Sequence, residues 1–192
     1  MSYRPITDMW FLARCKYKSG TKRYGGYLGG FPERARALLG CRLDQSVLHV
    51  CGGMAKDYPY RRGFGPNDKT MDLDPVCNPD FLQDAREAFP WCPQIGDGPM
   101  PSIATQIPWA GILIDPPYTE EDAKHYVPGA EKYPKPNQLI KNALDVLPVG
   151  GRVGLIHYIL PSPKNAIFVA CVGVICGFNN RIRVYSVFEK ES

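Results

Sequence analysis

The chain has 192 residues, of which 44% are hydrophobic and 22% are charged, and its formal net charge is +4. This composition is that of an ordinary globular protein and argues against a disordered chain. The length suits one domain with a sizeable core, so we expect a single domain over residues 1–192. The mild positive charge permits a nucleic-acid partner without requiring one. No apolar run reaches 18 residues and no signal-peptide pattern is present, so the sequence predicts neither a membrane span nor secretion.

The first 40 residues divide into an arm and a helix. Residues 1–32 are polar, basic and rich in glycine and tyrosine, which predicts an extended or looped N-terminal arm. Pro32 suits the first turn of a helix and Gly40 suits its end, so a helix is expected over residues 33–39.

Two short strands and a second helix are expected next. Residues 47–50 are apolar enough for a buried strand, which Gly52 and Gly53 would end. Another short strand ends near residues 70–74. The later part of residues 79–88 has helical composition.

The centre of the chain alternates between the two kinds of element. The apolar residues 110–114 predict a strand, and the polar, proline-containing residues 119–136 predict a substrate loop or lid. Apolar residues at helical spacing predict a helix over residues 137–147. A turn over residues 148–151 leads into a strand at residues 152–156.

The last part of the sequence is rich in β-branched residues. Residues 167–175 and 182–188 read as two strands joined by a hairpin at residues 177–180. Strands that alternate with helices are typical of βαβ units, so we expect an α/β fold whose mainly parallel sheet carries an antiparallel C-terminal hairpin.

The seven cysteines are an odd number and include no C-x-x-C pair. This pattern argues against a disulfide framework and against a structural zinc site. Several cysteines lie in apolar runs, such as residues 169–176, where buried reduced thiols are expected. The sequence therefore predicts a cytoplasmic protein without a metal.

The clearest chemical motif follows the predicted strand at residues 110–114. Pro116 and Pro117 stiffen the backbone there, so that Asp115 and Tyr118 would project from the carboxyl end of the strand, where ligands bind in open α/β sheets. A carboxylate and a backbone carbonyl could accept hydrogen bonds from an amino group, while the ring stacks on a base. This is catalysis by positioning and electrostatics. The alternative is a loop stiffened by proline.

The Asp-Pro-Pro-Tyr sequence at residues 115–118 resembles the catalytic motif of amino-group methyltransferases, which act on adenine N6 or cytosine N4. The form with aspartate is the usual adenine version. Residues 47–53 resemble the first nucleotide-binding loop of the Rossmann-like methyltransferase fold, and residues 147–152 resemble the turn before its fifth strand. The chain as a whole is similar to small DNA methyltransferases carried by bacteriophages. The resemblance implies S-adenosylmethionine as cofactor, DNA as partner and a prokaryotic or phage-infected cell.

The resemblance also implies a cofactor site after the first of these strands. Gly52 and Gly53 would let the backbone approach the methionine part of the cofactor. His49 and Cys51 stand where the family usually has an acidic residue and a glycine. Phe31, in a stretch that resembles the family motif before that strand, would cover the cofactor or would otherwise pack as a hydrophobic staple.

Three aspartates are candidates for the remaining cofactor contacts. Asp72, at the end of the second strand, would accept hydrogen bonds from the ribose hydroxyls, with Asp74 as the second choice. Asp84 resembles the acidic residue that receives the adenine amino group of the cofactor. The alternative for each is an exposed turn or cap residue.

Aromatic and basic residues are candidates for the substrate side. An enzyme that acts on a base in duplex DNA must flip the base out and stack it. Tyr126 and Tyr133 lie near the catalytic motif, and His157 and Tyr158 follow the strand at residues 152–156 and could flank such a pocket. Tyr126 and Tyr133 could equally pack within the lid. Lys16 and Lys18, interleaved with tyrosines, suit single-stranded or flipped nucleotides, or form a solvated arm. Further candidates for phosphate contacts are Arg61, Arg62, Lys164, Arg181 and Arg183.

Three hypotheses follow for the function. The first is methylation of adenine N6 in duplex or single-stranded DNA. The second keeps the chemistry and changes the acceptor to cytosine N4, RNA or a protein glutamine, although Asp115 argues against glutamine. The third is a binding protein without turnover, which the departures at His49 and Cys51 motivate. The target sequence and the oligomeric state stay open.

Overall fold

The computed structural model describes residues 4–17, 26–93, 108–126, 133–177 and 181–192. The strands are β1 (Ile6–Leu12), β2 (Val47–Val50), β3 (Lys69–Asp72), β4 (Phe81–Leu82), β5 (Gly111–Ile114), β6 (Arg152–His157), β7 (Ala166–Cys176) and β8 (Ile182–Lys190). The α-helices are α1 (Phe31–Leu39), α2 (Glu120–Tyr126) and α3 (Pro136–Asp145), and short 3-10 turns occupy η1 (Ala55–Asp57) and η2 (Pro75–Cys77).

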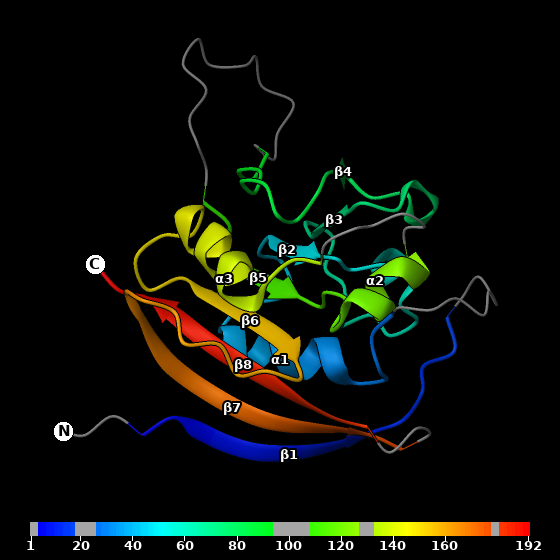
Figure 1. The fold of residues 1–192 in the computed structure, drawn as a ribbon, viewed down its shortest axis with the longest axis horizontal. Coiled ribbons are helices and arrows are strands. Elements are labelled where there is room, and N and C mark those ends of the chain that lie inside the picture. The colour runs from blue at the N-terminus through cyan, green and yellow to red at the C-terminus, as the bar shows by residue number, and fades with distance from the viewer. Residues whose placement is uncertain (1–3, 18–25, 94–107, 127–132, 178–180) are drawn as a thin grey trace, which may run out of the picture.

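All eight strands form one sheet, in the order β1-β7-β8-β6-β5-β2-β3-β4 (Figure 1). Strand β8 is antiparallel to both of its neighbours, β6 and β7, and the other pairings in the described chain are parallel. The expected α/β fold with an antiparallel C-terminal hairpin is therefore confirmed. The carboxyl ends of the other seven strands and the start of β8 share one edge of the sheet, the edge beside α2.

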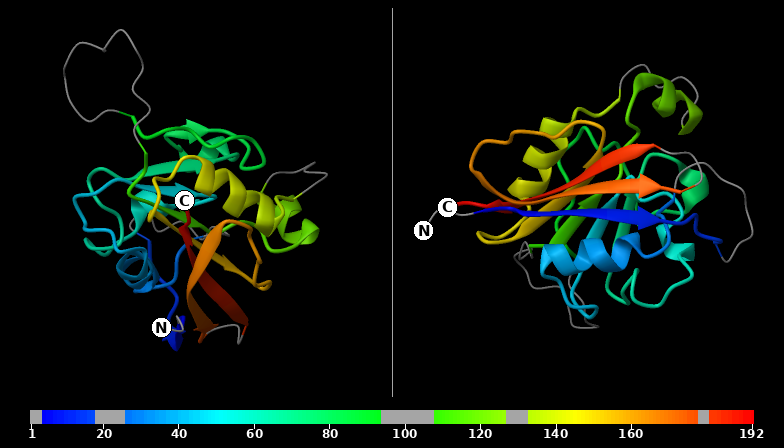
Figure 2. Two further views of the ribbon diagram at one scale, coloured as in Figure 1. Left: turned by 90° about the vertical axis from the view of Figure 1, so that its left-hand side faces the viewer. Right: turned by 90° about the horizontal axis from the view of Figure 1, so that it is seen from below.

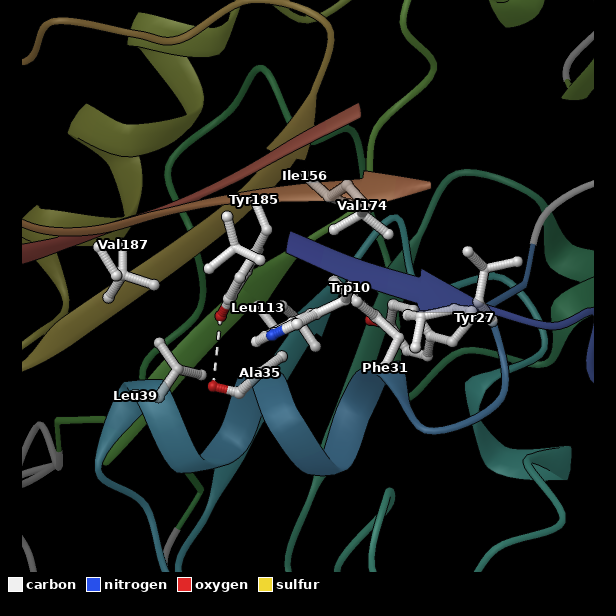
Figure 3. Close-up of a cluster of buried hydrophobic side chains, with 14 of the residues drawn as sticks. Trp10, Tyr27, Phe31, Ala35, Leu39, Leu113, Ile156, Val174, Tyr185 and Val187 are labelled. Carbon is white, nitrogen blue, oxygen red and sulfur yellow. Dashed lines mark hydrogen bonds between the residues drawn. The ribbon is translucent and has the colours of Figure 1, made fainter. Parts of the chain in front are cut away.

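Helices cover both faces of the sheet. The right-hand view of Figure 2 shows α1 on one side and α3 on the other. Helix α1 packs its buried face on a cluster that includes Trp10, Phe31 and Tyr185 (Figure 3). The hydroxyl of Tyr185 donates a hydrogen bond to the carbonyl of Ala35 (3.3 Å), which ties β8 to α1. The second cluster joins α3 to the centre of the sheet through residues such as Ile140.

The expected helices around residues 33–39 and 137–147 are confirmed, with small shifts at their ends. Helix α1 starts at Phe31, so Pro32 lies in its first turn, where a missing N–H costs nothing. It ends at Gly40, whose φ of 73° is left-handed and whose N–H bonds the carbonyl of Ala37 (3.1 Å).

The helix expected in the later part of residues 79–88 is wrong. The two-residue strand β4 pairs with β3 there, followed by turns. The Asp80 carboxylate accepts hydrogen bonds from the N–H (2.8 Å) and the hydroxyl (3.0 Å) of Thr70, which holds this segment beside β3. The local composition favours a helix, but the hydrogen bonds between Asp80 and Thr70, ten residues apart in the sequence, hold the segment extended beside β3.

Regular elements occur in the segment expected as a loop or lid and in the arm expected to be extended or looped. Residues 119–136 include α2, whose first turn is capped by the Thr119 hydroxyl accepting from the N–H of Asp122 (3.0 Å). A threonine three residues before an acid is a helix-start signal that the loop interpretation overlooked. The N-terminal arm contributes β1, which pairs with β7 and buries Trp10 and Leu12.

No helix in the described ranges is long and apolar enough to cross a membrane. Likewise, the described residues contain no group of three histidine, cysteine or acidic side chains arranged to hold a metal ion. Cys15, Cys41, Cys92 and Cys176 are buried as free thiols, as the sequence predicts.

Candidate active site

Asp115 lies directly beyond β5 and continues the hydrogen bonding of the sheet. Its N–H donates to the carbonyl of Val50 at the end of β2 (3.1 Å), so the backbone is fixed before the two prolines. The hydroxyl of Tyr118 then donates a hydrogen bond to Oδ1 of Asp115 (2.6 Å). The side chains of Asp115 and Tyr118, on either side of the two prolines, therefore contact each other at the shared edge of the sheet.

The ring of Tyr118 is enclosed by side chains from β6 and β8. His157 meets it edge-on with ring centroids 5.5 Å apart, and the Tyr158 ring lies 4.7 Å away. The guanidinium carbon of Arg183 stands 5.0 Å from the ring centroid. Burial raises the pKa of Tyr118 well above its ordinary value, so the hydroxyl stays protonated and keeps donating to Asp115.

The carboxyl group of Asp115 has a perturbed acidity. Burial raises its pKa to about 6, while the charge of Arg183 and the hydrogen bond from Tyr118 oppose that rise. Asp115 is therefore mainly a carboxylate at neutral pH. The negative charge of Asp115 helps to raise the pKa values of one thiol and four phenols. These groups are Cys51, Tyr17, Tyr27, Tyr118 and Tyr126. Their raised pKa values leave them uncharged, which makes Arg183 the counter-charge among them.

The turn after β2 sits next to this carboxylate. Cys51 and Gly53 have left-handed φ angles of 52° and 50°, a conformation that costs a cysteine more than a glycine. The N–H of Gly53 donates to Oδ2 of Asp72 (2.9 Å), and the N–H of Asp74 donates to its Oδ1 (3.0 Å). Asp72 at the end of β3 is thus held in place by backbone donors, while burial raises its pKa.

Three carboxylates converge on the turn after β2. Burial raises the pKa of the Cys51 thiol, and the charges of Asp72, Asp115 and Asp84 raise it further. Asp84 is itself paired with Arg86 at 2.5 Å, which lowers the pKa of its carboxyl group. Acidic surroundings of this kind favour a ligand that carries positive charge.

Two residues expected at the cofactor direct their side chains into the core instead. Nδ1 of His49 lies 3.0 Å from the Tyr27 hydroxyl and Nε2 lies 3.1 Å from Asp68, so both ring nitrogens are engaged on the α1 face. Phe31 is 1% exposed and packs on Tyr27 at a centroid distance of 5.6 Å (Figure 3). The contacts with the cofactor expected of His49 and Phe31 stay predictions.

His157 ends β6 inside the same aromatic cluster as Tyr118. Its Nδ1 accepts a hydrogen bond from the N–H of Ile159 (3.0 Å), and its Nε2 is buried without a hydrogen-bond partner among the described residues. Burial lowers the pKa of His157, so the imidazole is neutral at pH 7.

The other expected substrate residues are scattered over the same edge. Tyr126 ends α2 with 38% of its surface exposed, and its hydroxyl senses the charge of Asp115. Tyr133 is half-buried just before α3, and Lys16 is exposed beyond β1. Lys18 lies outside the described residues. A hollow of about 440 Å³ opens beside the motif, lined by Thr119, Glu121, Asp122, Tyr158, Arg181 and Ile182.

Comparisons with known proteins establish the fold. No family model matches the chain, and no curated protein sequence matches it significantly. Among solved structures, the chain is similar to TrmN from Thermus thermophilus, with a TM-score of 0.55 and 20% identity over 86% of this chain and 50% of that one. It is also similar to HI0767 from Haemophilus influenzae, with a TM-score of 0.50 and 11% identity over 94% and 99% of the two chains. The chain has the Rossmann-like methyltransferase fold. It spans half the length of TrmN.

A further neighbour is SMU.1697c from Streptococcus mutans, whose structure is a complex with SAH. Its TM-score is 0.47 and its identity 13%, over 82% of this chain and 96% of that one.

The strand order of this methyltransferase fold places the motif at its reversal point. From β2 the chain proceeds outward through β3 and β4, and from β5 it proceeds the other way through β6. Ligands in such sheets bind beyond the carboxyl ends of the two strands that flank the reversal. Cys51 follows β2 and Asp115 follows β5, so the two flank the expected position of a ligand.

Tyr158 and Arg183 take a larger part in the site than the sequence indicates. Arg183 was only one of several phosphate candidates, because nothing local distinguishes it from other basic residues of an edge hairpin. The register of β8 on β6, which pairs Val184 with His157, carries Arg183 to the ring of Tyr118. Tyr158 follows directly from β6, and a strand end next to the predicted motif was the available signal.

Proposed function

We propose that this protein transfers a methyl group from S-adenosylmethionine to an exocyclic amino group of a nucleic-acid base, adenine N6 of DNA first among the acceptors. The observation that carries the proposal is the placement of Asp115 and Tyr118. An ionised carboxylate, oriented by a phenol at 2.6 Å, sits at the reversal point of a methyltransferase fold. The identity of the base and the choice of DNA rest on the form of the motif with aspartate.

The residues around the turn after β2 fit the cofactor. S-adenosylmethionine supplies an electrophilic methyl group on a positively charged sulfur. Asp72, held by the N–H groups of Gly53 and Asp74, can accept hydrogen bonds from ribose hydroxyls. A Cβ at position 52 would stand 3.1 Å from that of His49, which is a tight contact, so glycine suits the close packing of this turn on β2. The acidic surroundings of Cys51 complement the cationic ligand.

Asp115 would act on the substrate amino group through its second oxygen. With Oδ1 bonded to Tyr118, Oδ2 and the carbonyl of Pro116 are the acceptors that we assign to the two amino hydrogens. These hydrogen bonds draw the nitrogen lone pair out of the base ring and aim it at the donor. The new N–C bond would form as the bond between the methyl group and the sulfur breaks, leaving a neutral thioether, and the nitrogen would give up one proton. With a pKa of about 6, the Asp115 carboxylate can accept that proton and release it to water.

The aromatic cluster suggests how the base is held. The Tyr118 ring is already packed between Tyr158 and Arg183, so we assign it the task of orienting Asp115. Tyr158 is 37% exposed beside the hollow of about 440 Å³, and its outer face is the surface on which we expect the base to stack.

Expression in a bacterial host that lacks adenine methylation tests this function. DNA and RNA are digested to nucleosides and analysed by mass spectrometry. We expect N6-methyladenine in DNA with the wild type and with Asp44→Ala, a control in an exposed surface ion pair, and none with Asp115→Ala. N4-methylcytosine alone would replace adenine as the acceptor, and methylation of RNA alone would replace DNA. Absence of any mark, together with no calorimetric signal for the cofactor, would favour a binding protein without turnover.

A further inference from the structure

A second, larger hollow opens on the α1 side of the same sheet edge. It measures about 650 Å³ and lies between the end of β1, the start of α1 and the segment after η1. Gly30, just before α1, has a left-handed φ of 81°, and a Cβ built there would meet no atom within 4 Å, so its backbone borders open space. A hollow of this volume is large enough for a nucleotide.

The walls of this hollow are cationic and carry an aromatic ring. Arg14, Arg61 and Arg62 line it, against one acidic residue, Glu33. The Glu33 carboxylate accepts a hydrogen bond from the hydroxyl of Tyr58 (2.9 Å). This hydrogen bond weakens the repulsion between Glu33 and a bound anion. The hydroxyl of Tyr58 in turn accepts from the N–H of Gly30 (2.7 Å), so one hydroxyl holds both Gly30 and Glu33, which line the hollow.

Tyr60 supplies a stacking surface at the rim of the hollow. Its side chain is 52% exposed, and it meets Tyr58 edge-on with centroids 5.4 Å apart. Tyr58 meets Tyr17 at 6.3 Å, and the Tyr17 hydroxyl senses the charge of Asp115. Tyr17, Tyr58 and Tyr60 thus form a row of edge-on ring contacts that ends at the hollow.

We propose that this hollow is a binding subsite for a nucleotide of single-stranded nucleic acid that flanks the target base, with Arg61 and Arg62 on the phosphates and Tyr60 stacked on the base. The proposal rests on the nucleic-acid substrate of the proposed function. Guanidinium groups match phosphate oxygens in geometry as well as in charge. An exposed ring next to cations suits unstacked bases, whereas a paired duplex hides its base faces.

The test measures binding of a labelled single-stranded oligonucleotide of about 12 nucleotides by fluorescence anisotropy, over a range of salt concentrations. Each phosphate contact on a single strand contributes about 0.7 to the salt slope, so Arg61→Ala/Arg62→Ala should lower that slope by about 1.4 and weaken binding roughly 20-fold near 0.1 M salt. Tyr60→Ala should weaken binding about tenfold with an unchanged slope, and Tyr60→Phe should bind like the wild type.

The matched control removes two exposed cations elsewhere. Arg42 precedes β2 at the opposite edge of the sheet and pairs with Asp44, while Lys141 lies on α3 and pairs with Asp145. The variant Arg42→Ala/Lys141→Ala loses the same charge and should bind within about twofold of the wild type, because only distant charges change.

Two results would overturn the subsite. One is a double arginine variant that binds the oligonucleotide as the control variant does. The other is a double arginine variant that loses calorimetric binding of S-adenosylmethionine, which would assign the hollow to the cofactor. The proposed function fails separately: oligonucleotide binding that depends on Arg61 and Arg62, in a protein that transfers no methyl group, would keep the subsite and reject the activity.

Discussion

Replacing Arg183 by leucine removes the positive charge beside Asp115 while it keeps apolar bulk against Tyr118. The hydrogen bond of 2.6 Å from Tyr118 to Asp115 and the 5.0 Å stack of Arg183 on that ring define the geometry. Because the guanidinium opposes the rise that burial causes in the pKa of Asp115, its loss must raise that pKa further. The carboxylate that we assign to the amino group would then be protonated at higher pH.

The size of this effect follows from the two contacts. They place the guanidinium within roughly 10 Å of the carboxylate, where a unit charge contributes about 1.7 kcal/mol at an effective dielectric constant of about 20. That energy corresponds to about one pKa unit. Starting from a pKa of about 6, the carboxyl group of Asp115 in the variant would have a pKa of about 7 and would be about half protonated at neutral pH.

Two measurements check the shift. The first is the pH dependence of kcat/KM for methyl transfer, whose acid limb should move from about 6 in the wild type towards ~7 in Arg183→Leu and return most of the way in Arg183→Lys. The second is a carbon NMR titration of labelled aspartate carboxyl groups, with Asp115→Asn to assign the resonance. An unchanged carboxyl titration in Arg183→Leu would refute the electrostatic role, even if the rate fell.

Three further changes test other parts of the structure. Asp68→Ala should lower the free energy of unfolding by about 3–5 kcal/mol in denaturant titrations, because it strands the buried Arg36, whereas Asp44→Ala in an exposed ion pair should cost about 0.5 kcal/mol or less. Equal losses of unfolding free energy in the two variants would contradict a stabilising role for the buried pair of Arg36 and Asp68. Asp72→Asn should weaken calorimetric binding of S-adenosylmethionine tenfold or more, at about 1.5–3 kcal/mol for a hydrogen bond to a charged group. Unchanged affinity would remove Asp72 from the site. Tyr158→Ala should raise KM for DNA more than it lowers kcat, and the opposite split would assign Tyr158 to the chemical step.

Residues whose signal is local were predictable from the sequence. The apolar residues 47–50 and 110–114 formed the expected strands, because each is too short and too apolar to do anything but pair inside a sheet. Asp115 and Tyr118 could be placed because two prolines fix the backbone between them. The helix α1 followed from Pro32 at its start and a glycine at its end.

Features that depend on contacts between distant segments could not be predicted from the sequence. Residues 79–88 have the composition of a helix, but hydrogen bonds between Asp80 and Thr70 hold them against β3. His49 fits a cofactor loop by position, yet its ring turns to Tyr27 and Asp68 on the far side of the strand. The conformation of residues 79–88 and the direction of the His49 side chain both depend on residues far away in the sequence. The spacing of nearby residues therefore could not predict either one.

The most direct test of the central claim compares methyl transfer by the purified wild-type protein and by the variant Asp115→Asn. Labelled S-adenosylmethionine and unmethylated DNA are incubated with each protein, and the product nucleosides are identified. The account predicts that the wild type forms N6-methyladenine and that Asp115→Asn forms none while it still folds and binds the cofactor. A folded Asp115→Asn variant that methylates DNA at the wild-type rate would contradict it.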